Sequence, residues 1–170
     1  MSLLIRKALP EDAYELAACH ISAWQSAYKG IVPDDYLDNM HTGLEQRAER
    51  FKQGVDENSY YYVPTHNGEI IGKLVLWNSR DDDKPGTGEI GGFYLTETFW
   101  GKGYGREMMD FAIKFLNSLG YTEIFLWVLE ENTRARRFYE KCGFICDGTK
   151  KEIIIGNKLL IEVRYILNIN

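Results

Sequence analysis

The sequence predicts an α/β fold built around one mixed sheet. Segments rich in β-branched and aromatic residues alternate with segments of helical spacing, and glycine or Asn-Gly turns separate them. With 170 residues, 45% of them hydrophobic, the chain can bury a full core, and no repeat, low-complexity tract or linker divides it. We therefore expect residues 1–170 to form a single domain.

The N-terminal part is expected to hold a strand and a long helix. The strand covers residues 3–8, and Pro10 then begins the helix at a position where its missing N–H costs little. Apolar residues continue at helical spacing until Gly30, a residue typical of helix ends. Residues 31–37 read as a connection with a single helical turn.

A second helix and a hairpin come next. Thr42 and Glu45 have the spacing of a capping box, which predicts a helix that ends before Gly54. Strands at 59–65 and 70–77 are separated by an Asn-Gly turn, the strongest short signal for a β-hairpin.

The middle of the chain combines a polar loop, a strand and a helix. The charged residues at 80–86 are expected to form a solvated loop, and 89–95 a strand. A helix at 103–119 ends at Gly120, and its apolar stripe is expected to be buried. The residues of this stripe are Met108, Ala112, Phe115, Leu116 and Leu119.

The C-terminal part predicts an interior strand, a short helix and a hairpin. Residues 121–129 are almost continuously apolar, as in a strand covered on both faces. Asn132 is suited to cap a helix that Gly143 ends. A Gly-Asn turn at 156–157 precedes the last strand at 159–167.

The strand at 89–95 and the glycines after it indicate a binding site. Gly91-Gly92 within a strand suggests a bulge or a close backbone approach. Gly101, Gly103 and Gly105 precede a helix, where unobstructed N–H groups and the helix dipole attract an anion such as a diphosphate. Two common phosphate-binding motifs are excluded. A dinucleotide fingerprint needs a third glycine where this chain has Arg106, and a Walker loop needs Ser or Thr after Lys102, where this chain has Gly103.

Charge and reactive side chains exclude several classes of function. The net charge of −5 and the lack of a basic run argue against a nucleic-acid partner, and no apolar run is long enough for a membrane span. Scattered histidines without ligand spacing predict no metal site. The odd number of cysteines, the absence of CxxC spacing and the lack of a signal-peptide pattern favour a cytoplasmic protein.

Three segments in this order resemble the acetyl-CoA-binding core of the GNAT superfamily of N-acetyltransferases, over about residues 88–145. They are Gly101-Lys102-Gly103-Tyr104-Gly105, Phe125-Leu126-Trp127-Val128, and the run from Asn132 to Phe144. The resemblance implies a mostly antiparallel mixed sheet of about six to seven strands, flanked by about four helices, with one splayed strand pair. The residues at 23–33 are similar to the first helix of many bacterial members.

The resemblance also implies where acetyl-CoA binds. Main-chain groups of Phe93 and Leu95 would pair with the pantetheine arm, and Asn132 would lie beside it. The pyrophosphate would be held by Gly101, Lys102, Gly103, Gly105 and Arg106. Trp100 departs from the family pattern, which usually has Arg or Gln at the start of this loop. One face of the helix that follows Asn132 is basic through Arg134, Arg136, Arg137 and Lys141. It either approaches the phosphates of the CoA adenosine or, as we expect, is solvated.

The resemblance also implies two catalytic residues. Transfer to an amine requires removal of a proton, because an alkyl amine with a pKa near ~10 is mostly protonated at neutral pH. Glu89 stands where the histone-acetylating members carry their glutamate, so the resemblance implies Glu89 as this base. A second position that the family uses for the base is Trp127 in this chain, which cannot take that role. The alternative is a relay of the proton through water. Tyr139 would lie close to the thioester sulfur and supply a proton to it.

These observations predict transfer of an acetyl group from acetyl-CoA to a primary amine of a small molecule or a peptide. The alternative is an acyl-CoA-binding sensor or regulatory module without turnover, which would need neither Tyr139 nor Glu89. Trp24 and Tyr28 either pack in the core or line the acceptor pocket. The interpretation names no metal, nucleic-acid or membrane partner, and it leaves a homodimer open.

Overall fold

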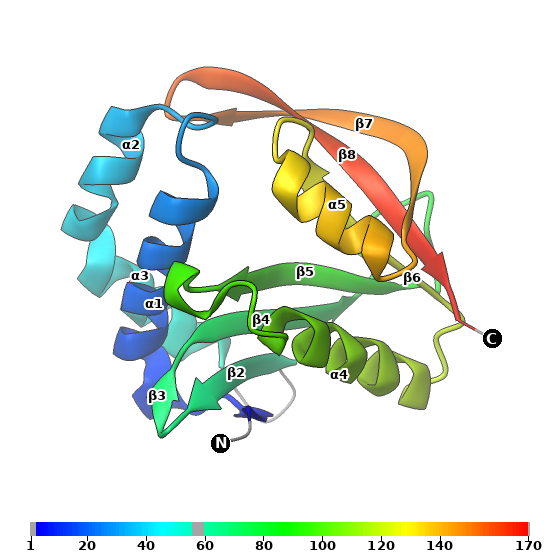
Figure 1. Cartoon of the computed structure of the whole chain (residues 1–170), viewed down its shortest axis with the longest axis horizontal. Helices are drawn as coiled ribbons and strands as arrows, with labels where there is room; N and C mark the ends of the chain where they lie inside the picture. The colour runs from blue at the N-terminus through cyan, green and yellow to red at the C-terminus, as the bar shows by residue number, and fades with distance from the viewer. Residues whose placement is uncertain (1–2, 56–59, 170) are drawn as a thin grey trace.

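The computed structural model describes residues 3–55 and 60–169 (Figure 1). In chain order the elements are β1 (Leu4–Lys7), α1 (Ala13–Ala27), α2 (Asp34–Asp38), α3 (Leu44–Gly54), β2 (Tyr61–His66), β3 (Glu69–Ile70), β4 (Gly72–Asn78), β5 (Gly88–Leu95), α4 (Tyr104–Ser118), β6 (Glu123–Leu129), α5 (Thr133–Lys141), β7 (Ile145–Ile155) and β8 (Lys158–Asn168). The predicted strand at 70–77 is interrupted at Ile71, which separates β3 from β4. The predicted start of β2 at Ser59 lies outside the described residues.

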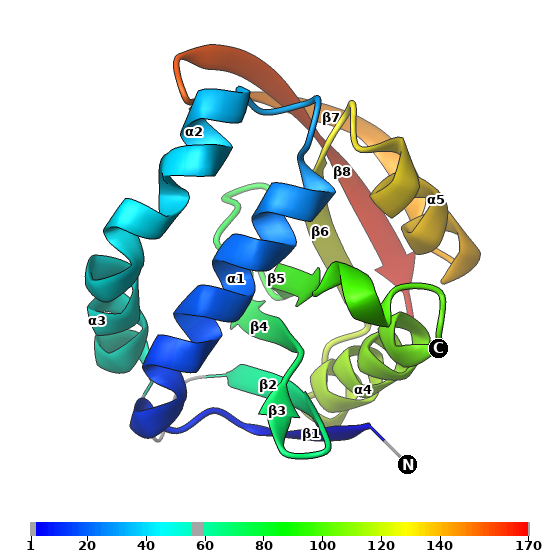
Figure 2. The same cartoon turned by 60° about the vertical axis from the view of Figure 1, so that its left-hand side comes forward.

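One eight-stranded sheet organises these elements. Its strand order is β1-β2-β4-β5-β6-β8-β7, with β3 paired to β2. All neighbouring strands are antiparallel except β5 and β6, so the predicted mixed, mostly antiparallel sheet is confirmed. Helices α1 and α3 cover one face, and α4 and α5 lie against the other, while the long β7–β8 hairpin arches over the top (Figures 1 and 2).

The sheet opens at its centre between β5 and β6. These strands pair only from Gly88 to Ile90 on β5 and from Ile124 to Leu126 on β6. The neighbouring ladder between β4 and β5 contains a bulge, because Val75 pairs with Gly92 and the next residue of β4 pairs with Ile90. Gly91 is therefore the extra residue, and the added bend directs the rest of β5 away from β6. The sheet has the predicted splayed strand pair.

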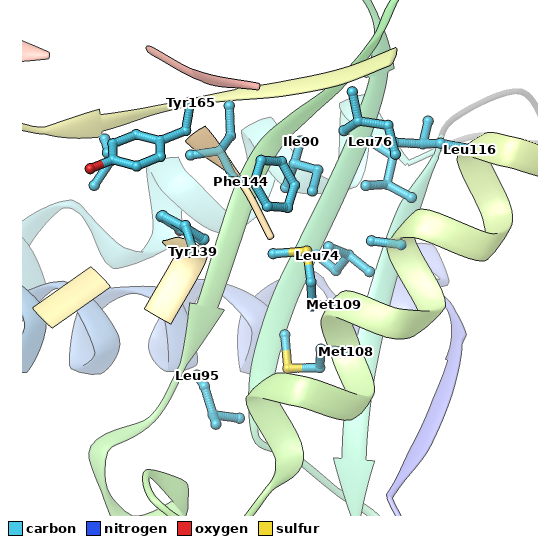
Figure 3. Close-up of a cluster of buried hydrophobic side chains, with 14 of the residues drawn as sticks. Leu74, Leu76, Ile90, Leu95, Met108, Met109, Leu116, Tyr139, Phe144 and Tyr165 are labelled. Atoms are coloured by element: carbon cyan, nitrogen blue, oxygen red, sulfur yellow. The ribbon is translucent and has the colours of Figure 1, made fainter. Parts of the chain in front are cut away.

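The main core lies between α4, α5 and the sheet (Figure 3). Figure 3 shows Met108 and Met109 of α4 against Leu74 of β4, with Tyr139 and Tyr165 at the other end of the cluster. Met108, Ala112 and Leu116 are buried as predicted, and Met109 joins them. Phe115, also predicted to be buried, is only partly buried at the edge of the core. Leu119 is 44% exposed because α4 ends at Ser118 and the chain turns away, so its predicted burial is wrong.

Two local predictions also require correction. Thr42 does not cap α3: it lies in a 3₁₀ turn, its hydroxyl donates to the carbonyl of Asn39, and Gly43 precedes the helix. The loop at 80–86 is not simply solvated, because Asp81 and Asp83 accept hydrogen bonds from Arg164 of β8. By contrast, Asn132 caps α5 as predicted, accepting the N–H of Ala135 over 3.1 Å.

Candidate active site

A cavity of about 760 Å³ fills the opening between β5 and β6. Gly101, Gly103, Gly105 and Arg106 line it where α4 begins, and α5 lines it from Asn132 to Lys141. A second group of lining residues comes from the end of α1, the loop after β4 and the strands β5, β6, β7 and β8, and we call this group the α1 side of the cavity. It consists of Tyr28, Arg80, Glu89, Tyr94, Trp127, Lys151 and Glu162.

The glycine loop presents a row of free main-chain donors. Gly101 and Gly103 have φ values of 72° and 89°, which only glycine adopts without strain. The first N–H after the loop with a main-chain partner is that of Arg106, which donates to the carbonyl of Gly103 over 2.9 Å. Within the described residues, the N–H groups of 101–105 donate no hydrogen bond. Five consecutive unpaired donors at a helix N-terminus form a site suited to a diphosphate.

Trp100 holds this loop in place. Its indole N–H donates to the carbonyl of Leu95 over 2.7 Å, which ties the loop to the end of β5. On the other side, the guanidinium of Arg134 lies 3.2 Å from the centre of the Trp100 ring. The departure from the family pattern at this position therefore has a structural role, because the indole joins β5, the glycine loop and α5.

The other basic residues of α5 divide between two environments. Arg134, Arg137 and Lys141 line the cavity beside the glycine loop. Arg136 instead turns towards the protein, where it donates to the hydroxyl of Tyr165 and to the carbonyl of Glu130, each over 3.0 Å. The expectation of one solvated basic face is thus wrong for Arg136.

Three tyrosines line the cavity where the sheet splays. Tyr139 is 7% exposed and lines the cavity, while the hydroxyls of Tyr28 and Tyr94 are 3.5 Å apart. Burial raises the pKa of Tyr139 far above its ordinary value, with a smaller effect from Tyr94. The pKa of Tyr28 is likewise raised by burial, and the neighbouring Tyr94 adds to the effect. These phenols therefore stay protonated at neutral pH and act as hydrogen-bond donors.

Glu89 is 3% exposed and both of its carboxylate oxygens are bound by Arg80. Nη2 of Arg80 donates to Oε1 over 2.6 Å, and Nε and the main-chain N–H donate to Oε2 over 3.1 and 3.2 Å. The hydrogen bond to Glu89 raises the pKa of Arg80. Because the side chain of Arg80 is 61% exposed, the arginine is the partner that can move away.

Of the remaining predicted site residues, some line the cavity and others do not. Phe93, Leu95 and Asn132 line the cavity. Lys102 is not among the lining residues, and its ammonium lies 5.4 Å from the ring centre of Phe99. Trp24 also lies outside the lining: its ring packs against Tyr28 and Tyr94 at centroid distances of 4.8 and 6.3 Å, whereas Tyr28 itself reaches the cavity.

Sequence reasoning missed four residues on the α1 side of the cavity, namely Arg80, Tyr94, Lys151 and Glu162, and it placed Arg80 in a solvated loop. Tyr94 follows the bulge, and its position could be found from strand alternation once the bulge at Gly91 is known. Lys151 and Glu162 pair across β7 and β8, and no local motif marks them. Their place in the cavity depends on the register of the last hairpin.

The comparison with family models decides the classification. The model described as "Acetyltransferase (GNAT) family" matches residues 20–144, which include the splayed strands, the glycine loop and α5. The chain belongs to the GNAT family of acetyltransferases. It is an acyltransferase, since its curated relatives are named N-acetyltransferases.

Two Bacillus subtilis proteins illustrate the relationship. An uncharacterized N-acetyltransferase, YuaI, is 26% identical over 128 residues, which cover 75% of this chain and 72% of that protein. The spermine/spermidine N(1)-acetyltransferase is 26% identical over 155 residues, covering 87% and 91%. Among solved structures, the PaiA N-acetyltransferase of Thermoplasma acidophilum in complex with coenzyme A has a similar fold. Its TM-score is 0.71 with 23% identity, and the match covers 95% of this chain and 98% of that one.

The described residues hold neither a candidate metal site nor a membrane-spanning helix. Across 3–55 and 60–169, no group of three or more His, Cys, Asp or Glu side chains is arranged to hold a metal ion. Within the same residues, no helix has the length and apolar character needed to cross a membrane.

Proposed function

We propose that this GNAT protein transfers the acetyl group of acetyl-CoA to a primary amine of a small molecule or peptide, by direct attack of the amine. The observation that carries the proposal is a single cavity that is lined by Gly101, Gly103 and Gly105 of the donor loop and also by Tyr139. A thioester could thus extend from an anchored diphosphate to a proton donor. The name of the spermine/spermidine relative supports an amine as acceptor.

The residues present fit acetyl-CoA, which supplies an acyl group activated as a thioester. A Cβ built at Gly101 or Gly103 meets nothing within 4 Å, so space in front of these amides is open to a ligand. Main-chain groups of Phe93 and the following residues lie on the unpaired edge of β5, where an extended amide chain can add as a strand. The indole of Trp100 already occupies one acceptor position at Leu95, so this pairing depends chiefly on Phe93.

The proton transfers are assigned to residues at the splay. As the amine nitrogen bonds to the acyl carbon and the carbon–sulfur bond breaks, the amine must lose a proton and the sulfur must gain one. Tyr139 has a raised pKa and would donate to the sulfur. Glu89 would accept the amine proton, directly or through a water, once Arg80 moves from its carboxylate. Because Glu89 is paired with Arg80, the main alternative to Glu89 as the base is a relay of the amine proton through water.

Two measurements test this function. Saturating acetyl-CoA should raise the thermal midpoint, because a ligand that binds only the native state stabilises it by mass action. Release of free thiol from acetyl-CoA should then depend on an added amine from a mixed panel. Binding without amine-dependent thiol release would favour a sensor module over an enzyme. No thermal shift and no heat of binding would contradict the proposal itself.

A further inference from the structure

The α1 side of the cavity already holds a primary ammonium group, that of Lys151. Its Nζ lies 4.0 Å from the centre of the Trp127 ring and 3.4 Å from Oε2 of Glu162. An aromatic face together with a carboxylate is a receptor for an alkylammonium ion. All three residues line the cavity, so the same receptor is accessible to a ligand within it.

The receptor is built rigidly around Trp127. The indole N–H donates to Oδ2 of Asp81 over 2.9 Å, and Asp81 is also bound by Arg164. Glu162 is the less exposed member of its ion pair, with 19% of its side chain accessible against 45% for Lys151. The indole is therefore held by Asp81, Glu162 is the more buried partner, and the more exposed lysine is the member that can leave.

Charge near the receptor also favours a cation. Arg164, whose guanidinium lies 5.5 Å from the centre of the Trp127 ring, pairs with the carboxylates of Asp81, Asp83 and Asp147. One positive charge thus faces three negative ones. Because a half-exposed ion pair such as Lys151–Glu162 contributes little to stability, a ligand ammonium can replace the lysine at small cost.

The receptor lies a short distance along β6 from the proposed reacting centre. Leu126 is the last residue of β6 that pairs with β5, and Trp127 is the first beyond the splay. Glu89, the proposed base, pairs with Phe125, two residues before Trp127 on β6. Two residues of strand span about 7 Å, a length that an extended short diamine also covers.

We propose that the acceptor is a diamine, or a larger amine with a second cationic group, whose non-reacting ammonium binds between Trp127 and Glu162 in place of Lys151. This inference rests on the proposed acetyl transfer and assigns its substrate class. Glu162 is then a specificity-determining residue, and Lys151 competes with the substrate for the same carboxylate.

The test compares diaminobutane with butylamine, which differ by one ammonium group. Glu162→Gln should raise the KM for diaminobutane by about tenfold and leave that for butylamine unchanged, because only the diamine loses a charged partner. Lys151→Met should lower the KM for diaminobutane several-fold. Lys150→Met and Glu130→Gln are matched controls, since this ion pair belongs to the same region but neither residue lines the cavity. Both controls should match the wild type.

Calorimetry separates failure of this inference from failure of the proposed function. Titration of the CoA-loaded wild type and of Glu162→Gln with each amine measures recognition without turnover. Tighter binding of diaminobutane than of butylamine, lost in Glu162→Gln, supports the inference even if no thiol is released. Equal binding of the two amines overturns it, even if acetyl transfer proceeds. A fall in kcat for both amines in Glu162→Gln, rescued at high pH, also overturns it by making Glu162 the base.

Discussion

Replacement of Gly91 by alanine should disrupt the bulge that opens the sheet. A Cβ at this position would lie 1.9 Å from Nε1 and 2.1 Å from Cδ1 of the Trp77 indole. The indole cannot move freely, because its ring packs edge-on against Tyr61 at 5.5 Å and lies 5.3 Å from the guanidinium of Arg80. Alanine therefore forces either the indole or the bulged strand to shift.

The size of the effect follows from this overlap. Overpacking of a filled site costs about 1–3 kcal/mol. For a domain of this size, that corresponds to a fall in Tm of roughly 3–10 °C. The control is Gly92→Ala, because a Cβ there meets Val75 at 3.3 Å, a contact that a small adjustment relieves. We expect Gly92→Ala to lower Tm by much less than Gly91→Ala.

Thermal denaturation followed by circular dichroism measures both variants, and calorimetry measures their affinity for acetyl-CoA. Gly91→Ala should weaken that affinity as well, since the bulge directs β5 away from β6. A double variant with Trp77→Leu should recover part of the loss, because the substitution removes the colliding ring. Equal stability of Gly91→Ala and Gly92→Ala would refute the claim that the Trp77 indole leaves no room for a side chain at Gly91.

Three further variants test single residues. Tyr139→Phe should lower kcat on the order of 10- to 1000-fold with little change in acetyl-CoA affinity, and unchanged turnover in steady-state assays would remove the phenol from the mechanism. Glu89→Gln should lower kcat, with partial rescue at high pH as more amine becomes neutral, and a pH–rate profile identical to that of the wild type would leave a water relay as the base. Lys73 is 8% exposed, and burial, with Arg47 nearby, lowers its pKa to about 7 from 10.5. Between these values the unfolded lysine binds a proton that the folded one lacks, so wild-type stability should rise with pH. Lys73→Met should reduce the gain from pH 7 to pH 9 by about 1–2 kcal/mol in urea denaturation, and an unchanged gain would show that the lysine is charged in the fold.

The sequence predicted those features that depend on local backbone chemistry. Gly103 before α4, Asn132 as the cap of α5 and Gly91-Gly92 as a strand irregularity each act within a few residues, so their roles could be read from spacing. Thr42 shows the limit of this reasoning, since a 3₁₀ turn uses its hydroxyl before α3 begins.

The missed features depend on contacts between distant segments. The loop at 80–86 seemed a solvated charged run until the fold placed Asp81 and Asp83 beside Arg164, more than eighty residues away in the chain. Glu162 reaches the cavity through the register of β8, which no motif in β8 itself specifies. Residues of this kind could be found only once the sheet was assembled.

The splay has a consequence for how the protein folds and opens. Elements β1 to α4 come from residues 4–118 and β6 to β8 from residues 123–168, so each half of the sheet is a contiguous segment. Three residue pairs between β5 and β6 join the halves within the sheet, and the Arg164 cluster joins them near the same end. Because each half is one contiguous segment, we expect its own strand pairs to form without the other half, and the β5–β6 pairs to complete the sheet later. Separation of the halves would break the β5–β6 pairs and the shared core between α4 and α5 while the other strand ladders stay paired. We therefore expect amide hydrogen exchange at Gly88–Ile90 to report this opening separately from global unfolding.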